Sequence, residues 1–308
     1  MRVVLLGTAA GGGFPQWNCA CALCAGARDG RLPTRTRECA AVTGNGRDWW
    51  LLNASPDLRI QLTATRVLWP GPGPASGPAS GSGDTPLRGV LLTDAEADHV
   101  TGLPELRGAA GLKVYAAPPV RAVLTPLRAA LDRYAPWEWA DSLADGGFVL
   151  AGGLVVTAHS VGTRIPTYVP ARAPWPDGPW VTAYRVEDLA SGGVLLYAPC
   201  VGAWSPALDE LCASADCALL DGTFLAAGET GTATVATVRP GDDRAAMGHL
   251  PVTGPEGTLA HLARPPGFRR IYTHLNHTDP LLDPASPARA RMSAQGAEVL
   301  DDGAELEI

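Results

Sequence analysis

The segment Gly89-Val-Leu-Leu-Thr-Asp94-Ala-Glu96-Ala-Asp98-His99-Val-Thr-Gly102-Leu103 joins an apolar run to three carboxylates at alternate positions and a histidine. The apolar run predicts a buried strand, and a helix is predicted to begin near His99. Alternate positions in an extended turn point the same way, so these side chains are expected to converge at the end of the strand. Oxygen donors with one or two histidines favour Fe(II) or Mn(II). An acidic helix N-terminus, whose carboxylates cap free amides, is the alternative.

Short apolar runs bounded by Gly, Pro or Asp recur along the chain and predict strands. They are Val3–Leu6, Trp49–Leu52, Arg88–Leu92, Lys113–Ala116, Val149–Thr157, Val181–Val186, Val194–Tyr197, Ala218–Leu220 and Arg270–Thr273. Helical spacing of apolar residues predicts helices over Pro119–Arg133, Ser205–Ala213, Glu256–Arg264 and Ser286–Gly296. Many strands and few helices predict an α/β fold in which two sheets pack face to face with helices outside, a four-layer αββα sandwich.

We interpret residues 1–308 as a single domain of this kind, with two segments that depart from the pattern. Residues 70–86 (PGPGPASGPASGSGDTP) have too few apolar side chains to fold and predict a flexible insertion. The Pro-rich segment 166–180 contains Tyr168, Trp175 and Trp180. It is expected either to fold over a pocket or to be a surface loop held down by its rings.

Composition excludes several classes of protein. The formal charge of −7 leaves no basic stripe for a nucleic acid. No apolar run approaches the roughly 18–20 residues that span a bilayer, so no membrane partner is expected. The apolar stretch after Arg2 is too short for a secretory signal, and three of the seven cysteines crowd into Cys19–Cys24. This spacing indicates metal binding in the cytoplasm rather than disulfides.

The cluster Cys19-Ala-Cys21-Ala-Leu-Cys24 can present three thiolates to one Zn²⁺ ion from a tight turn. A fourth ligand must come from elsewhere, and His274 and His277 are the candidates. Because no position would stay open, we expect this zinc to be structural. Three reduced, half-buried cysteines are the alternative. The remaining thiols are expected to be buried and inert; they are Cys39, Cys200, Cys212 and Cys217.

The acidic segment has the spacing of the HxHxDH motif of metallo-β-lactamase-fold hydrolases. Asp94 and Glu96 stand in place of the first two histidines, and Asp98-His99 is retained. Nearly end to end, the chain resembles the pyrroloquinoline quinone (PQQ) biosynthesis protein B family. The other segments that carry the resemblance are Leu6–Cys24, Asn53–Asp57, Leu219–Phe224, Met247–His249 and His274–Asn276.

The resemblance implies where the metal ligands lie. Asp221 follows a later strand and would reach the metal, and His249 would be a loop histidine that faces the substrate. Thr163 stands where the fold has a further histidine ligand. The expected Fe²⁺ ligands are Glu96, Asp98, His99 and Asp221, with Asp94, His249 and His274 as further candidates. For the zinc site we favour His274 and keep His277 as the alternative fourth ligand. His159 and His261 are expected to be structural.

The resemblance also implies an activity. It predicts a non-haem iron oxidoreductase that uses O₂ to hydroxylate the tyrosine ring of a cross-linked Glu–Tyr product of the precursor peptide PqqA. Asp98 and His249 would act in catalysis, and other PQQ biosynthesis proteins are candidate partners. Two alternatives stay open. One is a non-enzymatic carrier of PQQ or its precursor. The other is a metal-dependent hydrolase. Because the motif histidines are missing, the remaining residues are less suited to hydrolysis by a metal-bound hydroxide.

Overall fold

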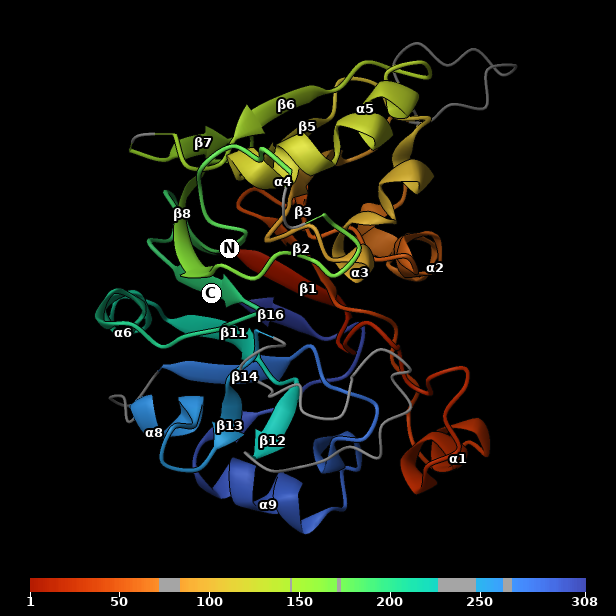
Figure 1. The fold of residues 1–308 in the computed structure, drawn as a ribbon, viewed down its shortest axis with the longest axis vertical. Helices are drawn as coiled ribbons and strands as arrows, with labels where there is room; N and C mark the ends of the chain where they lie inside the picture. Colours follow the sequence, from red (N-terminus) through yellow and green to blue (C-terminus); the bar gives the residue numbers. More distant parts are fainter. Residues whose placement is uncertain (72–83, 145, 171–172, 227–247, 263–267) are drawn as a thin grey trace.

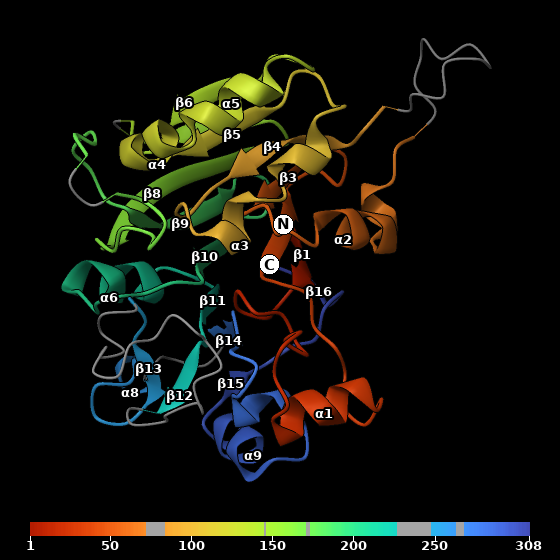
Figure 2. The same ribbon diagram turned by 45° about the vertical axis from the view of Figure 1, so that its right-hand side comes forward.

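Two large β-sheets lie face to face, and helices cover their outer sides (Figures 1 and 2). The computed structural model describes residues 1–71, 84–144, 146–170, 173–226, 248–262 and 268–308. This arrangement confirms the predicted four-layer αββα sandwich.

The first sheet is built from the N-terminal part of the chain together with the last strand. In spatial order its strands are β16 (Glu305–Glu307), β1 (Arg2–Gly7), β2 (Cys39–Thr43), β3 (Trp49–Leu52), β4 (Leu87–Leu91), β5 (Lys113–Ala116) and β6 (Glu138–Asp141). The pairs from β16 to β3 are antiparallel, and the pairs from β3 to β6 are parallel.

The second sheet has the same plan. In spatial order its strands are β15 (Ala297–Glu298), β14 (Arg269–Thr273), β11 (Cys217–Asp221), β10 (Val194–Ala198), β9 (Val181–Asp188), β8 (Leu154–Gly162) and β7 (Phe148–Leu150). The pairs from β7 to β10 are antiparallel, and those from β10 to β15 are parallel. A small separate parallel pair joins β12 (Phe224–Ala226) to β13 (Pro251–Thr253).

Helices pack on the outer face of each sheet. Those on the first sheet are α2 (Leu58–Ala64), η1 (Arg66–Leu68), α3 (Ala97–Val100), η2 (Leu103–Leu106), α4 (Pro118–Val123) and α5 (Thr125–Leu131). Those on the second are α1 (Ala22–Arg28), α6 (Pro206–Ala213), α8 (Thr258–His261), η3 (Pro280–Leu282) and α9 (Pro287–Ala294). In both views α4 and α5 lie at one end of the molecule and α8 and α9 at the other (Figures 1 and 2). Within the described ranges, no helix has the length and apolar character needed to cross a bilayer.

The apolar runs become strands because both of their faces are buried. In β1, Val3 and Leu5 point into the core between the sheets, while Val4 packs in the core beneath the helices. In β11, Leu219 lies between the sheets and Leu220 faces the opposite core. Since successive side chains of a strand alternate in direction, a strand covered on both faces needs a continuous apolar sequence.

Polar residues of both sheets meet at one edge of the sandwich. Parallel strands place their carboxyl ends at the same edge, where sites are commonly built. Here β3, β4, β10, β11 and β14 all end at this edge, and β2, which is antiparallel to β3, begins there. The polar or ligand-type residues at or just beyond these ends are Glu38, Asn53, Thr93, Asp94, Cys200, Asp221 and His274.

Two predicted elements need correction. The single helix expected over Pro119–Arg133 is two helices, α4 and α5, which meet at Leu124. Pro126 contributes to the break, because it lacks the N–H group that would bond to the Ala122 carbonyl in a continuous helix. The single strand expected over Val149–Thr157 is a hairpin of β7 and β8. Gly152 and Gly153 have positive φ and form its turn.

The two unusual segments are described in part. Within the expected insertion 70–86, residues 72–83 lie outside the described residues, and Gly71 pairs with Asp84 in an antiparallel bridge. In the aromatic segment, the Tyr168 hydroxyl donates to the carbonyl of Ala95. Trp175 and Trp180 contact each other edge to face, with ring centroids 6.0 Å apart.

Candidate metal centre

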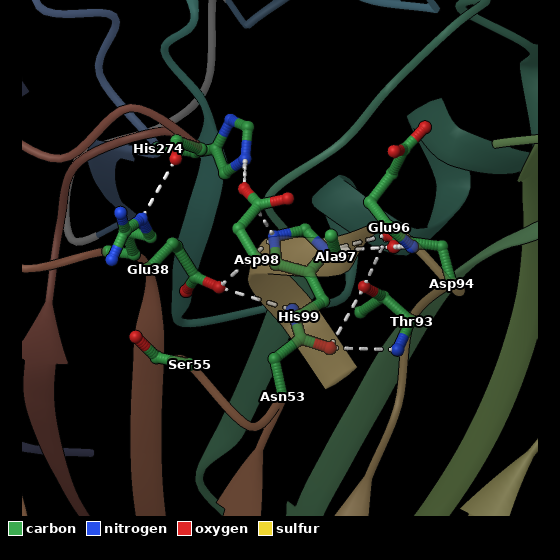
Figure 3. A network of polar contacts seen from close by, with 12 residues as sticks. Glu38, Asn53, Ser55, Thr93, Asp94, Glu96, Ala97, Asp98, His99 and His274 are labelled. Carbon is green, nitrogen blue, oxygen red and sulfur yellow. Dashed lines mark hydrogen bonds and ion pairs between the residues drawn. The ribbon is translucent and has the colours of Figure 1, made fainter. Parts of the chain in front are cut away.

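The acidic segment after β4 forms one wall of a polar centre at the strand ends (Figure 3). Asp94 turns back toward the first turn of α3, where it lies beside the ring of His99. Its two carboxylate oxygens lie 2.8 and 2.9 Å from His99 Nδ1. Asp94 also accepts hydrogen bonds from the Glu96 N–H and the Thr93 hydroxyl, both at 2.8 Å. A carboxylate held behind a histidine in this way fixes the direction of the other ring nitrogen.

That other nitrogen, His99 Nε2, points into the centre. It is buried and has no hydrogen-bond partner among the described residues. The nearest carboxylate oxygens belong to Asp98, at 3.8 Å, and Glu38, at 3.9 Å. A buried ring nitrogen without a partner is costly unless a ligand such as a metal ion occupies the space before it.

The second sheet supplies the opposite wall. Asp221, at the end of β11, is fully buried, and its Oδ2 lies 2.7 Å from His249 Nδ1. Its Oδ1 accepts a hydrogen bond from the Thr223 hydroxyl at 2.7 Å. His274 follows β14, with Nδ1 2.8 Å from that hydroxyl and Nε2 3.3 Å from Asp98 Oδ2. The two walls therefore meet at the contact between Asp98 and His274 (Figure 3).

Glu38 lies behind the centre, fully buried between the sheets. It accepts hydrogen bonds from the Tyr197 hydroxyl at 2.6 Å and from Asn53 Nδ2 at 3.1 Å. The side-chain oxygen of Asn53 accepts from the Thr93 N–H at 2.9 Å. Asn53 thus links Glu38 to the strand end that carries Asp94.

The buried carboxylates make positive charge favourable in the centre. Burial lowers the pKa of His99, but Asp94, Asp98 and Glu38 outweigh burial and raise the pKa to about 10. Burial raises the pKa of Asp98, yet the charges of His99 and His274 hold the pKa well below its usual range. Burial raises the pKa of Glu38 to about 7. The surroundings favour positive charge at this point, as a bound cation would supply.

A cavity of about 410 Å³ opens onto the centre. Asp98, His249 and His274 are among the residues that line it. Arg37, Arg164 and Trp17 line its wall, and the Trp17 side chain is 84% exposed. Among the described residues, none of the three rings of segment 166–180 lines this cavity, so their contacts fit the loop held down by its rings.

In this centre, two sets of donors from the described residues are close enough to hold an ion. Asp221, His249 and His274 offer ligand atoms that all lie within 4.8 Å of one another. The same holds for His99, Cys200 and His274. With the unpartnered His99 Nε2 and the buried carboxylates, these sets fit a divalent cation.

The structure changes two expectations about iron ligands. Glu96 does not join either donor set, and its side chain points away from Asp98 and His274 (Figure 3). It lines the cavity and lies 3.9 Å from Arg164 instead. Asp94 is engaged with His99, so it orients a ring rather than facing the cavity. Asp98 lies near His99 and His274, whereas Asp221 reaches the centre from the second sheet, beside His249 and Thr223.

The three cysteines of the N-terminal cluster also lie together. The sulfurs of Cys19, Cys21 and Cys24 are within 4.8 Å of one another. Cys21 is the N-cap residue of α1, and its sulfur accepts a hydrogen bond from the Cys24 N–H at 3.4 Å. Burial raises the pKa of the Cys24 thiol to about 12. Three thiols in such a turn fit Zn²⁺, whose charge favours the thiolate form.

For the fourth ligand of this site, the contacts of the two candidate histidines favour His277 over His274. Both of its ring nitrogens face the centre, toward Thr223 and Asp98. His277 is the histidine beside the cysteines, because its carbonyl oxygen lies 3.9 Å from the sulfurs of Cys21 and Cys24. Its buried Nε2 has no hydrogen-bond partner among the described residues. His277, the alternative ligand, therefore becomes the candidate that the geometry supports.

Three residues of the centre were not predicted as site residues from the sequence. Glu38 precedes β2, a strand of small residues that no pattern indicated. Thr223 was recognised only as part of a motif, although it lies two residues after Asp221 and contacts two histidines. Cys200 was expected to be inert, yet it lines the cavity. Its position just after the predicted strand Val194–Tyr197 was the available signal.

The other histidines and Thr163 lie away from the donor sets. His159 contacts the Thr157 hydroxyl at 2.8 Å, and His261 stacks on Trp204 with ring centroids 5.0 Å apart. Thr163 lines a second cavity, of about 440 Å³, which shares Arg164 with the first.

The chain is similar to known proteins along its whole length. Residues 48–275 match the model of the β-lactamase superfamily domain. Coenzyme PQQ synthesis protein B of Methylococcus capsulatus is 38% identical and that of Azoarcus sp. 39%, with 99% and 100% of each chain covered. The crystal structure of Zn²⁺-bound PqqB from Methylobacterium extorquens superposes with a TM-score of 0.85 at 32% identity, covering all of both chains. A diphosphatase of the PhnP family shares the fold, with a TM-score of 0.64 at 18% identity over 100% of this chain and 97% of the other.

Proposed function

Because this chain belongs to the coenzyme PQQ synthesis protein B family of the β-lactamase superfamily, we propose that it acts in cytoplasmic PQQ biosynthesis as an Fe²⁺-dependent oxygenase. The substrate we propose is a small peptide-derived molecule, the cross-linked Glu–Tyr product of PqqA, whose tyrosine ring gains a hydroxyl group from O₂. Other PQQ biosynthesis proteins are its proposed partners.

One observation carries the proposal. Asp221, His249 and His274 form a set of one carboxylate and two imidazoles whose ligand atoms lie within 4.8 Å of one another. Two histidines and one carboxylate with open positions are the ligand set of non-haem Fe(II) oxygenases. When bound there, Fe²⁺ would supply the electron-transfer chemistry that O₂ requires. This set replaces the combination of Glu96, Asp98, His99 and Asp221 expected from the sequence.

The neighbouring residues position this set. Thr223 contacts Asp221, His249 and His274 through one hydroxyl, so it fixes the spacing of all three side chains. Asp98 contacts His274 and lines the cavity, where its carboxylate can accept a hydrogen bond from a phenol. This gives Asp98 a substrate-positioning role. His249 then serves as a ligand rather than in the catalytic role that the resemblance implies.

The cavity wall suits the proposed substrate. Arg37 and Arg164 line it, and a guanidinium matches the geometry of a carboxylate. A cross-linked Glu–Tyr molecule carries carboxylates as well as a phenol. The exposed ring of Trp17 offers an apolar face for the phenol. The proposal of an aromatic, acidic substrate rests on these three side chains.

The test is an oxygen-incorporation assay. The protein is loaded anaerobically with Fe²⁺ and mixed with a tyrosine-containing dipeptide, ascorbate as a two-electron donor, and isotopically labelled O₂. One oxygen atom should replace a ring C–H bond by C–OH, while the other leaves as water with two protons and two electrons from ascorbate. The labelled product should be absent with Asp221→Asn.

Product that is absent from the wild-type protein at every iron loading would contradict the proposal. Tight binding of PQQ without turnover would then favour the carrier alternative. Cleavage of a chromogenic phosphodiester with Zn²⁺ or Mn²⁺ would favour the hydrolase alternative.

A further inference from the structure

Cys200 lies in the centre although the proposed function does not use it. It follows β10 at the edge where the metal-ligating side chains gather, and it lines the cavity. Its side chain is buried, but the thiol borders the space that a ligand would enter. Outside the N-terminal cluster, the other buried thiols, Cys39, Cys212 and Cys217, do not line this cavity.

A second, independent observation comes from His99. Asp94 holds His99 Nδ1, which leaves Nε2 as the free donor atom. The His99 side chain is fully buried, and this nitrogen has no hydrogen-bond partner among the described residues. Its ring lies 5.2 Å from that of His274, measured between centroids. An unpartnered donor therefore faces the space beside Cys200.

The distances allow one ion to contact all three donors. The ligand atoms of His99, Cys200 and His274 all lie within 4.8 Å of one another. With bonds of about 2.3 Å to sulfur and about 2.0–2.1 Å to nitrogen, two ligand atoms of one tetrahedral Zn²⁺ ion lie roughly 3.3–3.6 Å apart. The three donor atoms must therefore approach one another by up to about 1.5 Å when the ion binds.

We propose that Cys200 is a metal ligand, and that His99, Cys200 and His274 form a sulfur-containing set selective for thiophilic divalent cations such as Zn²⁺ or Cd²⁺. Binding forms a metal–sulfur bond and releases the thiol proton to solvent, with no change of oxidation state. The inference rests on the cation binding of the proposed function. It adds a donor that favours soft metals over Mn²⁺ or Mg²⁺.

The test uses Cd²⁺ titration of full-length protein whose cysteine cluster is already filled with zinc. Thiolate-to-cadmium absorption in the ultraviolet reports sulfur ligation. The variant is Cys200→Ser, and the matched control is Cys217→Ser, a buried thiol at the opposite end of neighbouring β11. Wild-type protein and the control should show the absorption of the centre, and Cys200→Ser should lose it. Cd²⁺ should bind Cys200→Ser about tenfold more weakly or worse, while Mn²⁺ affinity changes less.

Cadmium NMR of the wild-type protein gives an answer that needs no variant. The cysteine cluster and the centre should give separate resonances, and the second should fall where a mixed sulfur and nitrogen ligand set resonates. Cadmium bound in the centre with a shift typical of nitrogen and oxygen ligands alone would overturn the role of Cys200 and leave the proposed function intact. Failure of any cation to bind the centre of wild-type protein would overturn both.

Discussion

Asn53 and His274 hold backbone conformations that side chains disfavour. In the described part of the chain they are the non-glycine residues with positive φ, at 65° and 57°. Left-handed backbone costs roughly 1–2 kcal/mol for most residues and less for Asn. Strained residues persist where their surroundings fix them, which is often at functional sites. Here the strain aims one side chain at Glu38 and Thr93, and the other at Asp98.

Two substitutions of Asn53 separate the contribution of its side-chain hydrogen bonds from that of its backbone conformation. Asn53→Ala should lower the free energy of unfolding by about 2 kcal/mol or more, because buried groups of Thr93 and Glu38 lose their partner. Asn53→Gly loses the same hydrogen bonds but tolerates positive φ, so it should be about 1 kcal/mol more stable than Asn53→Ala. Urea denaturation measures both values. Equal stability of the two variants would show that the backbone conformation adds no strain.

Asp94 should affect metal binding without being a ligand. Asp94→Asn keeps the shape of the side chain but weakens its hold on His99, so the centre should bind its cation about tenfold more weakly. Asp48→Asn, at a surface loop, is the matched control. Metal titration monitored by calorimetry measures the change. An unaltered affinity for Asp94→Asn would mean that His99 takes no part in the site.

At the scale of elements, the sequence indicated the strands with long, large apolar runs and missed those with small or few residues. The strand Cys39–Thr43 was not predicted, because its small residues give a weak strand signal. This strand, β2, is fully buried, and Glu38 directly precedes it. The acidic segment indicated one wall of the centre, to which it contributes Asp94, Asp98 and His99 but not Glu96. The wall from the second sheet depends on the spatial order of the strands. The spacing of residues in the sequence does not give that order. The contacts of His274 with Asp98 and Thr223, which favour the centre over the cysteine cluster, could therefore not be predicted from the sequence.

Helix α6 begins where its capping residue predicts. The Ser205 hydroxyl accepts a hydrogen bond from the Leu208 N–H at 3.2 Å, and Pro206 occupies the first turn. Ser205→Ala should cost about 1 kcal/mol of unfolding free energy, and Ser205→Gly only a few tenths. Thermal or urea unfolding would show the difference. If Ala and Gly were equally tolerated, the cap would contribute nothing to α6.

At the scale of the whole molecule, one short segment joins two metal sites. His274 belongs to the centre between the sheets, and three residues later the His277 carbonyl approaches the cysteines before α1. The N-terminal cluster and the last part of the second sheet are thereby brought together. A zinc ion at the cysteines would tie these distant parts of the chain and stabilise the native state against unfolding.

Substitution of His277 and substitution of His274 should remove different metal ions. His277→Ala should lose zinc at the cysteines and unfold at a lower temperature, while it keeps the ion of the centre. His274→Ala should keep that zinc and lose the ion of the centre. Elemental analysis of both variants, with thermal unfolding, checks the assignment. Loss of zinc from His274→Ala alone would restore the assignment inferred from the sequence.

Anomalous X-ray scattering from crystals loaded anaerobically with Fe²⁺ tests the central claim most directly. Data collected on either side of the iron absorption edge locate iron separately from zinc. An iron peak is expected within bonding distance of Asp221, His249 and His274, beside Asp98. Iron found only at the cysteine cluster, or no iron peak between the two sheets, would contradict it.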